Sequence, residues 1–344
     1  METAAAAITF AAPSIEVIES LLDVTYTWGY QETRQKLRDL YDKAVRAQWI
    51  SDDVLPWNTD VDLGRPMGPE NLQPLFGSDI HARMTEAERR KLNTEVFSWT
   101  LSQFMHGEQG ALLATAQLVD SVDNLDSKLY AASQVVDEAR HVDVYNRYVH
   151  SKIGFSYPIN PHLKTLLDLI LKDSRWDMKF LGMQIMVEGL ALAAFGMIRT
   201  NTEEPLLKEL TSYVMGDEAR HVAFGILSLR DYYRQMPENE RREREDFVYE
   251  AARLMRDRFL FQEVWEKTGL PAKECMDIAL NNQGQVMFRQ LLFAKIVPAI
   301  KKMDLLSERQ RQRFAELGIL HFESWADPLA DLQQSPSGAT SARL

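Results

Sequence analysis

One hexapeptide, DEARHV, occurs twice in the 344-residue chain, with the second copy 80 residues after the first. On an α-helix, positions i and i+3 lie on the same face, so Glu138 would point with His141, and Glu218 with His221. A single Glu-x-x-His is more often an exposed pair on a charged helix than a binding site. Two copies in corresponding places favour a fold that brings the two helix faces together.

Helix signals dominate the sequence around the two copies, and strand signals are nearly absent. Thr85 and Glu88 form a capping box at the start of the first long segment, and a polar break at residues 121–127 separates it from the second. A loop rich in Gly and Pro and a short helix over residues 162–172 precede the third. Each segment runs for roughly 25 residues or more, longer than the average globular helix. The four segments are residues 85–119, 128–153, 173–200 and 202–236.

The connections within each pair of long segments are short, and a longer crossover joins the two pairs. This arrangement predicts two antiparallel hairpins that assemble as an all-α four-helix bundle. Further helices flank it, including one over about residues 31–49, and the charged run at residues 238–247 is expected to be a solvated helix face. The expected domains are an N-terminal helical extension at 1–84, the bundle at 85–236, packed C-terminal helices at 237–330 and a disordered tail at 331–344.

A lone glutamate stands 30 residues before each Glu-x-x-His. Glu108 and Glu188 both lie in apolar helical surroundings, where a carboxylate is costly unless it is paired or bound to a cation. No Arg or Lys lies between Leu181 and Met197, so the helix of Glu188 offers no cation nearby. Each hairpin therefore supplies one lone Glu and one Glu-x-x-His.

Four carboxylates and two imidazoles that converge in a bundle core suit two divalent first-row metal ions. Glutamates from two helices with Glu-x-x-His from the other two form the di-iron or di-manganese carboxylate pattern. In these residues the chain resembles the ferritin-like di-iron carboxylate proteins over about residues 85–233. The resemblance implies a ferritin-like bundle with additional N- and C-terminal helices, in which Glu138 and Glu218 bridge the ions. The implied ligands are Glu108, Glu138 and His141 for one iron, and Glu188, Glu218 and His221 for the other.

The aspartate before each Glu-x-x-His fits the same resemblance. Histidine ligands usually donate their second ring nitrogen to a carboxylate, and in similar proteins the aspartate of one half pairs with the histidine of the other. We therefore expect Asp137 beside His221 and Asp217 beside His141. Arg140 and Arg220 are expected in ion pairs behind the ligands. An exposed role for either aspartate is the alternative.

Other residues near the glutamates are candidates for a substrate pocket or for plain core. Glycines such as Gly107 and Gly110 indicate either close helix packing or room for substrate or dioxygen. Tyr145, four residues after His141, is expected beside the metal ligands. The pocket candidates, chosen by helical spacing from the two lone glutamates, are Phe104, Ala111, Thr115, Gln184, Leu192 and Phe195.

The composition narrows the class of protein. A net charge of -11 argues against general binding to nucleic acid or anionic membranes. The single cysteine, Cys275, excludes an intrachain disulfide and the rubredoxin-like site of rubrerythrins, and it is typical of a reducing cytoplasm. The start of the chain has no basic signal region, and the apolar run around Glu188 looks too short to span a membrane. We expect a cytoplasmic protein.

Several branches of the di-iron family fit in part. Tyr145 has the spacing of the radical tyrosine in the small subunit of class I ribonucleotide reductase, although the end of the chain lacks that subunit's docking peptide. Leu192 stands where hydrocarbon monooxygenases carry a threonine, and Ala191 stands near the threonine of acyl-carrier-protein desaturases. Arylamine N-oxygenases add a histidine ligand on the fourth helix, where Val214, one turn before Glu218, is no ligand. The ligand spacing is most similar to that of aromatic acyl-CoA epoxidases.

We therefore expect a non-haem di-iron oxygenase that uses dioxygen to hydroxylate, epoxidise, N-oxygenate or desaturate a small organic substrate. Two iron ions or a manganese and iron pair fit the ligands. Electrons would come from a separate reductase or ferredoxin, because no dinucleotide-binding fingerprint is present, and a homodimer is compatible with the sequence. The alternatives are a radical-generating subunit and a metal-binding ferritin-like protein without oxygenase activity.

Overall fold

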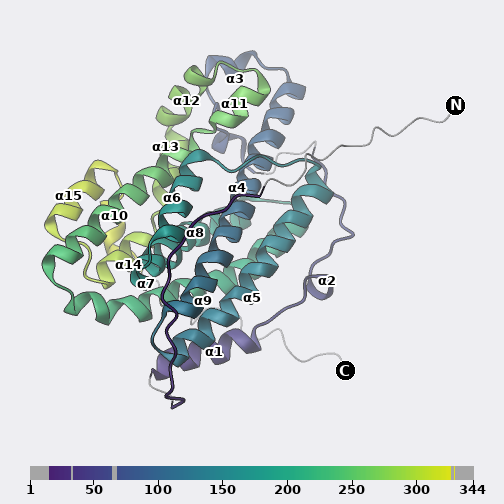
Figure 1. Cartoon of the computed structure of the whole chain (residues 1–344). Coiled ribbons are helices and arrows are strands. Elements are labelled where there is room, and N and C mark those ends of the chain that lie inside the picture. Colours follow the sequence, from purple (N-terminus) through teal and green to yellow (C-terminus); the bar gives the residue numbers. More distant parts are fainter. Residues whose placement is uncertain (1–14, 32–33, 64–67, 327–328, 330–344) are drawn as a thin grey trace.

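The computed structural model describes residues 15–31, 34–63, 68–326 and 329. All regular secondary structure in these residues is helical (Figure 1). The all-α prediction is therefore confirmed for this part of the chain. The predicted tail at residues 331–344 lies outside the described residues.

Four long helical runs form the bundle. The first begins with the predicted capping box, in which the Thr85 hydroxyl accepts from the Glu88 N–H and the Glu88 carboxylate accepts from the Thr85 N–H. The first run packs against the second and the third against the fourth, as the two predicted hairpins require. The runs are α4 (Glu86–Ser121), α5 (Leu125–Tyr148), α7 (Trp176–Phe180) continuing through η3 (Leu181–Val187) into α8 (Glu188–Asn201), and α9 (Pro205–Gln235).

The third run differs from the uniform α-helix expected over residues 173–200. It begins at Trp176, and η3 is a π-helix that ends directly before Glu188. A π-turn closes over five residues instead of four and is frequent at functional sites. The neighbouring α6 (Pro161–Lys172) approaches closely here, since a Cβ on Gly182 would lie 2.5 Å from Ile170 Cγ1. Residue periodicity does not reveal such a turn, because it depends on contacts with other helices.

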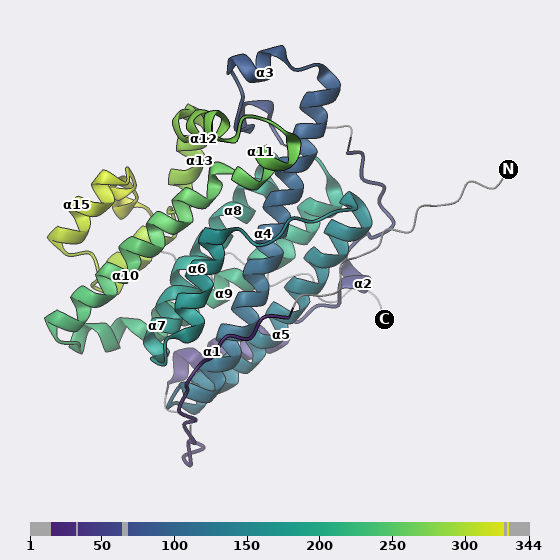
Figure 2. The same cartoon turned by 45° about the horizontal axis from the view of Figure 1, so that its top comes forward.

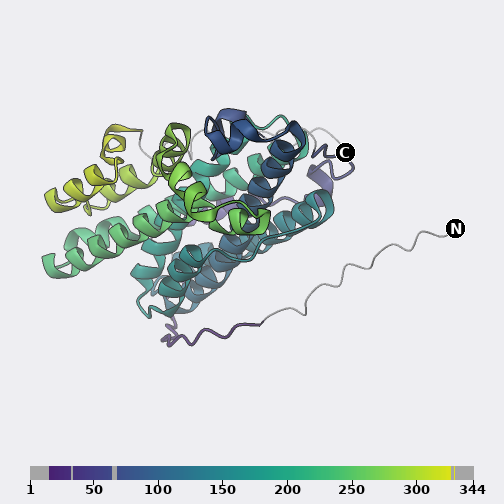
Figure 3. The same ribbon diagram turned by 90° about the horizontal axis from the view of Figure 1, so that it is seen from above.

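The remaining helices flank the bundle. α1 (Gln35–Arg46) lies against α5 and α9, and α6 joins the two hairpins while contacting α4 and α10. Figure 2 shows α10 beside α6, with α11 and α12 toward α3, and in Figure 3 the helices after α9 extend to one side of the bundle. The shorter elements before the crossover are α2 (Ser51–Val54), η1 (Glu70–Leu72), α3 (Asp79–Arg83) and η2 (Val149–Ile153). The C-terminal elements are α10 (Glu238–Asp257), η4 (Arg258–Leu260), α11 (Gln262–Thr268), α12 (Ala272–Asn281), α13 (Gln283–Leu291), α14 (Ile296–Lys302), α15 (Glu308–Glu316) and η5 (Leu320–Ser324).

Most residues of the charged run at residues 238–247 are exposed or half-buried, as expected of a solvated helix face, but two of them are buried. Arg244 is buried, and its Nε donates to Asp177 Oδ2 over 2.9 Å. Glu245 is also buried and accepts the backbone N–H of Ser307. Both side chains lie on the face of α10 that packs against the rest of the protein. The sequence does not reveal this face, because nearly every residue of the run is charged.

Close packing explains some of the glycines near the bundle centre. A Cβ on Gly110 would lie 2.5 Å from Leu167 Cδ2, and one on Gly225 would lie 2.8 Å from Gln184 Cβ. Gly107 has no atom within 4 Å of that position, so packing does not account for it. The close-packing explanation therefore holds for Gly110 and Gly225.

The third helical run is long and apolar enough to span a membrane, contrary to the expectation from its length in sequence. Over residues 176–201 the mean hydropathy of its most apolar window is 1.7, and 72% of that window is buried inside the protein. A central helix of a bundle gives the same signal, because it is surrounded by apolar neighbours on several sides.

We predict that Arg244→Ala lowers the free energy of unfolding by about 3 kcal/mol or more, because the Asp177 carboxylate would stay buried without its partner. The matched control is Arg242→Ala, which removes an exposed ion pair with Glu238 from the same helix and should change stability far less. Denaturant unfolding measures both variants. Equal losses would contradict a structural role for the buried pair.

Candidate metal centre

Six side chains from the four long helical runs meet in the middle of the bundle. None of them exposes more than 5% of its surface. Their convergence follows from the predicted hairpins, which place the middle of each run at the same level. They are Glu108 of α4, Glu138 and His141 of α5, Glu188 at the start of α8, and Glu218 and His221 of α9.

These side chains form two overlapping groups, each able to hold one metal ion. Within each group, one ligand atom per residue lies within 4.8 Å of the others. Carboxylate and imidazole donors at this spacing suit divalent first-row metals. The first group is Glu108, Glu138, His141 and Glu218, and the second is Glu138, Glu188 and His221.

Two glutamates face both histidines. His141 Nδ1 lies 3.5 Å from Glu138 Oε2 and 3.3 Å from Glu218 Oε1. His221 Nδ1 lies 3.1 Å from Glu138 Oε1 and 3.7 Å from Glu218 Oε2. Each of these carboxylates therefore turns one oxygen toward each imidazole, as a carboxylate that bridges two ions would.

The glutamates leave buried oxygen atoms without protein donors. Glu138 Oε2, Glu188 Oε2 and Glu218 Oε2 are buried and accept no hydrogen bond. Native interiors rarely leave such acceptors unsatisfied. Carboxylates crowded in a dry core also repel one another unless a cation or a proton lies between them. The donor set thus fits the two metal ions that the sequence pattern implies.

In the absence of a cation, protons must balance part of this negative charge. Burial, followed by the Glu218 carboxylate, raises the pKa of Glu108 well above its ordinary value. Burial also raises the pKa of Glu188, against the opposing effect of His221. Burial acts in the same direction on Glu138, but the two histidines outweigh it and hold the pKa of that carboxyl below its ordinary value.

Each histidine pairs with the aspartate of the other hairpin, as expected from the sequence. His141 Nε2 lies 3.1 Å from Asp217 Oδ2, and His221 Nε2 lies 3.4 Å from Asp137 Oδ2. With Nε2 donating to the aspartate, Nδ1 faces the glutamates and can bind a metal once its proton is displaced. Burial lowers the pKa of both histidines, but their carboxylate partners outweigh it and raise both values well above the ordinary one.

Two residues that follow α1 hold these aspartates, and no sequence signal pointed to them. Gln48 Nε2 donates to Asp137 Oδ1 over 2.7 Å, and Trp49 Nε1 donates to Asp217 Oδ2 over 2.8 Å. Arg140 donates to both aspartates, and its guanidinium carbon lies 4.5 Å from the centre of the Trp49 ring. The expected ion pairs of Arg140 behind the ligands are therefore present. The cation–π contact with Trp49 links Arg140 to the N-terminal part of the chain as well.

Gln134 is a further residue that the sequence prediction did not include. It is fully buried one turn before Glu138, and its Nε2 donates to Glu138 Oε1 over 2.9 Å and to Glu188 Oε1 over 2.8 Å. The corresponding place in the second hairpin, four residues before Glu218, is the apolar Val214. A polar residue four positions before a buried glutamate was the signal that could have identified Gln134.

Tyr145 lies in an aromatic cluster at the His141 side of the centre. Its ring stacks on Phe195 with 5.7 Å between ring centres, and Phe104 lies 4.8 Å from Phe195. The Tyr145 hydroxyl is buried and has no hydrogen-bond partner. Burial, followed by the charge of Glu108, raises the pKa of Tyr145 well above its ordinary value.

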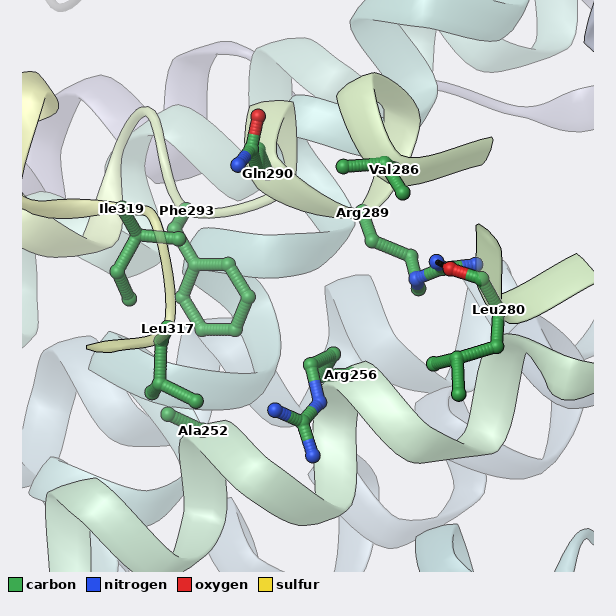
Figure 4. A pocket seen from close by; sticks show the side chains of 9 residues that line it. All are labelled: Ala252, Arg256, Leu280, Val286, Arg289, Gln290, Phe293, Leu317 and Ile319. Carbon is green, nitrogen blue, oxygen red and sulfur yellow. Dashed lines mark hydrogen bonds between the residues drawn. The ribbon is translucent and has the colours of Figure 1, made fainter. Parts of the chain in front are cut away.

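The pocket candidates are tightly buried in this structure. None of the six exposes more than 5% of its surface, and Gln184 Nε2 donates to the Thr115 hydroxyl over 3.3 Å. Ala111 and Leu192 are part of the apolar core. A recess of about 170 Å³ lies away from them, where Phe293 faces Arg256 of α10 (Figure 4).

Comparison with known proteins gives one family and distant structural relatives. Residues 30–304, well over half of the chain, match the family model described as P-aminobenzoate N-oxygenase AurF. A variant of an R2-like ligand-binding oxidase with an anaerobically reconstituted Mn/Fe cofactor is 18% identical, with 77% of this chain and 92% of that chain covered and a TM-score of 0.48. The dimanganese(II)-NrdF of Streptococcus sanguinis is 13% identical, with coverage of 86% and 99% and a TM-score of 0.52, which indicates a shared fold. No curated protein matches the chain.

We predict that the metal-free protein binds Fe²⁺, or Co²⁺ as its substitute, more tightly as the pH rises. Burial raises the pKa of Glu108 and Glu188, so these groups hold protons that an incoming ion must displace. Isothermal titration calorimetry in two buffers of different ionisation enthalpy counts the protons released. An affinity that does not change with pH, without proton release, would contradict the pKa directions.

Proposed function

The chain belongs to the family of the p-aminobenzoate N-oxygenase AurF, and on that premise we propose that it oxygenates the amino nitrogen of a small aryl amine. At the coarser level it is an oxidoreductase of the oxygenase class with a di-metal centre. The ligand spacing alone was most similar to that of epoxidases. The matched family favours N-oxygenation instead. The observation that carries the proposal is the buried cluster of four carboxylates and two imidazoles inside the matched residues.

In this proposal the two groups of side chains hold two iron ions. Glu138 and Glu218 would bridge the ions, because each directs one oxygen toward each histidine. Glu108 would complete the first ion's ligands and Glu188 those of the second. The mixed oxygen and nitrogen donors suit two iron ions. They would also suit one manganese and one iron ion.

The chain departs from the additional histidine ligand expected of arylamine N-oxygenases. Val214 occupies that place and offers no donor. Instead, Gln134 of the other hairpin donates to Glu138 and Glu188 and fixes the orientation of both carboxylates. The proposed centre therefore has six protein ligands, and Gln134 supports two of them from behind.

When bound, the metal pair supplies the electrons and the binding site through which dioxygen is activated. The protein contributes geometry and exclusion of water. Asp217 and Asp137 hold the histidine tautomers, and the buried aromatic wall keeps water from the reacting groups. The Tyr145 hydroxyl keeps its proton because burial raises its pKa, and it can donate a hydrogen bond at this wall.

The remaining requirements concern partners and location. Electrons for each turnover would come from a separate reductase or ferredoxin, since the helical fold described here contains no nucleotide-binding strand and helix unit. We also propose that the protein forms a homodimer and lies in the cytoplasm. The cytoplasmic location is in keeping with the single cysteine.

A radical-generating role is the second candidate. It is favoured by Tyr145, whose buried hydroxyl lacks a partner and lies four residues after His141. Electron paramagnetic resonance separates the two roles after the reduced protein is exposed to dioxygen. A persistent tyrosyl signal that disappears in Tyr145→Phe would favour the radical role.

We predict two irons per chain, and loss of about half or more of the bound metal in Glu188→Ala, because this change removes a ligand of one ion. The matched control is Glu209→Ala, which removes an exposed glutamate of α9 and should keep both irons. Elemental analysis of protein loaded under nitrogen measures the stoichiometry. Full retention of iron in Glu188→Ala would refute the ligand assignment.

We further predict that the iron-loaded protein, supplied with a chemical reductant and ¹⁸O₂, converts aryl amines to products carrying ¹⁸O on nitrogen. Mass spectrometry of a panel of para-substituted anilines measures incorporation. Glu188→Ala should lose at least about tenfold in rate, since the loss of one ligand disables the paired centre. Label found only on ring carbon, or label from water, would exclude N-oxygenation.

A further inference from the structure

Arg258, at the start of η4, is buried without a counter-charge. It exposes 5% of its surface, and its Nε is buried without a hydrogen bond. Within the described part of the chain its guanidinium forms no ion pair, and its only specific contact is the Phe259 ring, 4.7 Å from the guanidinium carbon. Burial lowers the pKa of Arg258 to about 10, so the side chain is still charged at neutral pH. A buried charge without a partner is costly.

The other buried arginines of the described residues have partners. Arg220 pairs with Asp217, and Arg244 pairs with Asp177. Arg289 donates to the backbone carbonyl oxygens of residues 279 and 280. Arg289 also lines the recess of Figure 4, but its guanidinium already donates to two carbonyl oxygens. That recess therefore contains no arginine without hydrogen-bond partners that a ligand would have to satisfy. Arg258 is the exception.

A second recess, of about 80 Å³, lies beside Arg258 where the start of α6 meets η4 and α11. Asn160 and His162 line it from the α6 side, and Gln262 lines it from α11. The positive end of the α6 dipole therefore faces the same space as the arginine. Asn160 Nδ2 already donates to Glu263, and Gln262 Nε2 already donates to Glu266. The Arg258 guanidinium is therefore the group whose donors are left for an anion.

Two acidic residues also line the recess, and three of their four carboxylate oxygens accept hydrogen bonds from other residues. Glu263 accepts from Trp99 Nε1 over 2.9 Å and from Asn160 Nδ2 over 2.7 Å. The Asp257 carboxylate accepts from Arg256 Nε over 2.6 Å. Neither forms an ion pair with Arg258, so the charge of this arginine is left for another group to balance.

We propose that this recess binds a compact oxyanion, a carboxylate or a tetrahedral anion such as sulfate or phosphate, against the Arg258 guanidinium. The planar fork of arginine matches such oxygens in pairs. The volume of about 80 Å³ equals that of two to three water molecules at about 30 Å³ each, so only a compact anion fits. An aryl amine substrate is too large for it.

The recess is separate from the metal centre. Trp99, which contacts its wall through Glu263, lies nine residues before Glu108 on α4, or about 13 Å along the helix. A bound anion would tie η4 and α11 to α6 and, through Glu263, to α4. We therefore expect binding to stabilise the attachment of the C-terminal helices to the bundle.

Thermal unfolding of the iron-loaded full chain tests the proposal. Sulfate and acetate are added in separate arms at low millimolar concentration, each against chloride at equal ionic strength. We expect a saturable rise in Tm of about 3 °C or more in at least one arm, because an anion that binds only the folded state stabilises it. The arm that responds identifies a tetrahedral or a planar anion.

Arg258→Gln should lose this rise while keeping or increasing Tm without added anion, because the unpaired charge is removed. Arg289→Gln, at a buried arginine with carbonyl partners, is the matched control and should keep the rise. The absence of a rise in both arms, or an equal rise in Arg258→Gln, would overturn the proposal. If Arg258→Gln does not fold, calorimetric titration of the unmodified protein with sulfate and acetate decides the question, and no saturable one-site binding in either would overturn it.

Discussion

Four carboxylates placed in one dry core are the constraint on which the bundle depends. Each costs free energy to bury alone, and their mutual repulsion adds to that cost. Two divalent ions remove both penalties, but only if the four glutamates approach within a few ångströms of two imidazoles, as they do here. Long antiparallel helices meet this demand, because each ligand lies well inside a helical run that packs in the apolar core.

The same constraint extends to the N-terminal part of the chain. The aspartates that orient the histidines are themselves buried and charged. Gln48 and Trp49 donate hydrogen bonds to them, and Arg140 balances their charge. Because Gln48 and Trp49 follow α1, the docking of α1 against α5 and α9 and the orientation of the histidines stabilise each other. The extension is therefore part of the machinery that shapes the centre, although it contributes no candidate ligand.

The sequence allowed prediction of features that depend on local spacing. The i, i+3 pairs, the 30-residue offsets and the capping box at Thr85 all follow from helix geometry within one segment. Features that depend on contacts between segments were not predictable. The π-helix before Glu188 and the burial of Arg244 arise where other helices approach. Trp49 meets Asp217 only because α1 crosses the bundle, 168 residues away in sequence.

The two hairpins carry the same candidate ligands but differ in the residues that hydrogen-bond to them. This difference affects how freely each carboxylate can move. Gln134 binds Glu138 and Glu188, whereas Val214 leaves the equivalent side of Glu218 without a donor. A carboxylate held by a neutral amide is restrained in direction, while one with a free buried oxygen can turn more easily between two ions. Glu138 and Glu218 both have such an oxygen, but only Glu138 is also held by Gln134. Carboxylate movement at this centre should therefore be concentrated at Glu218.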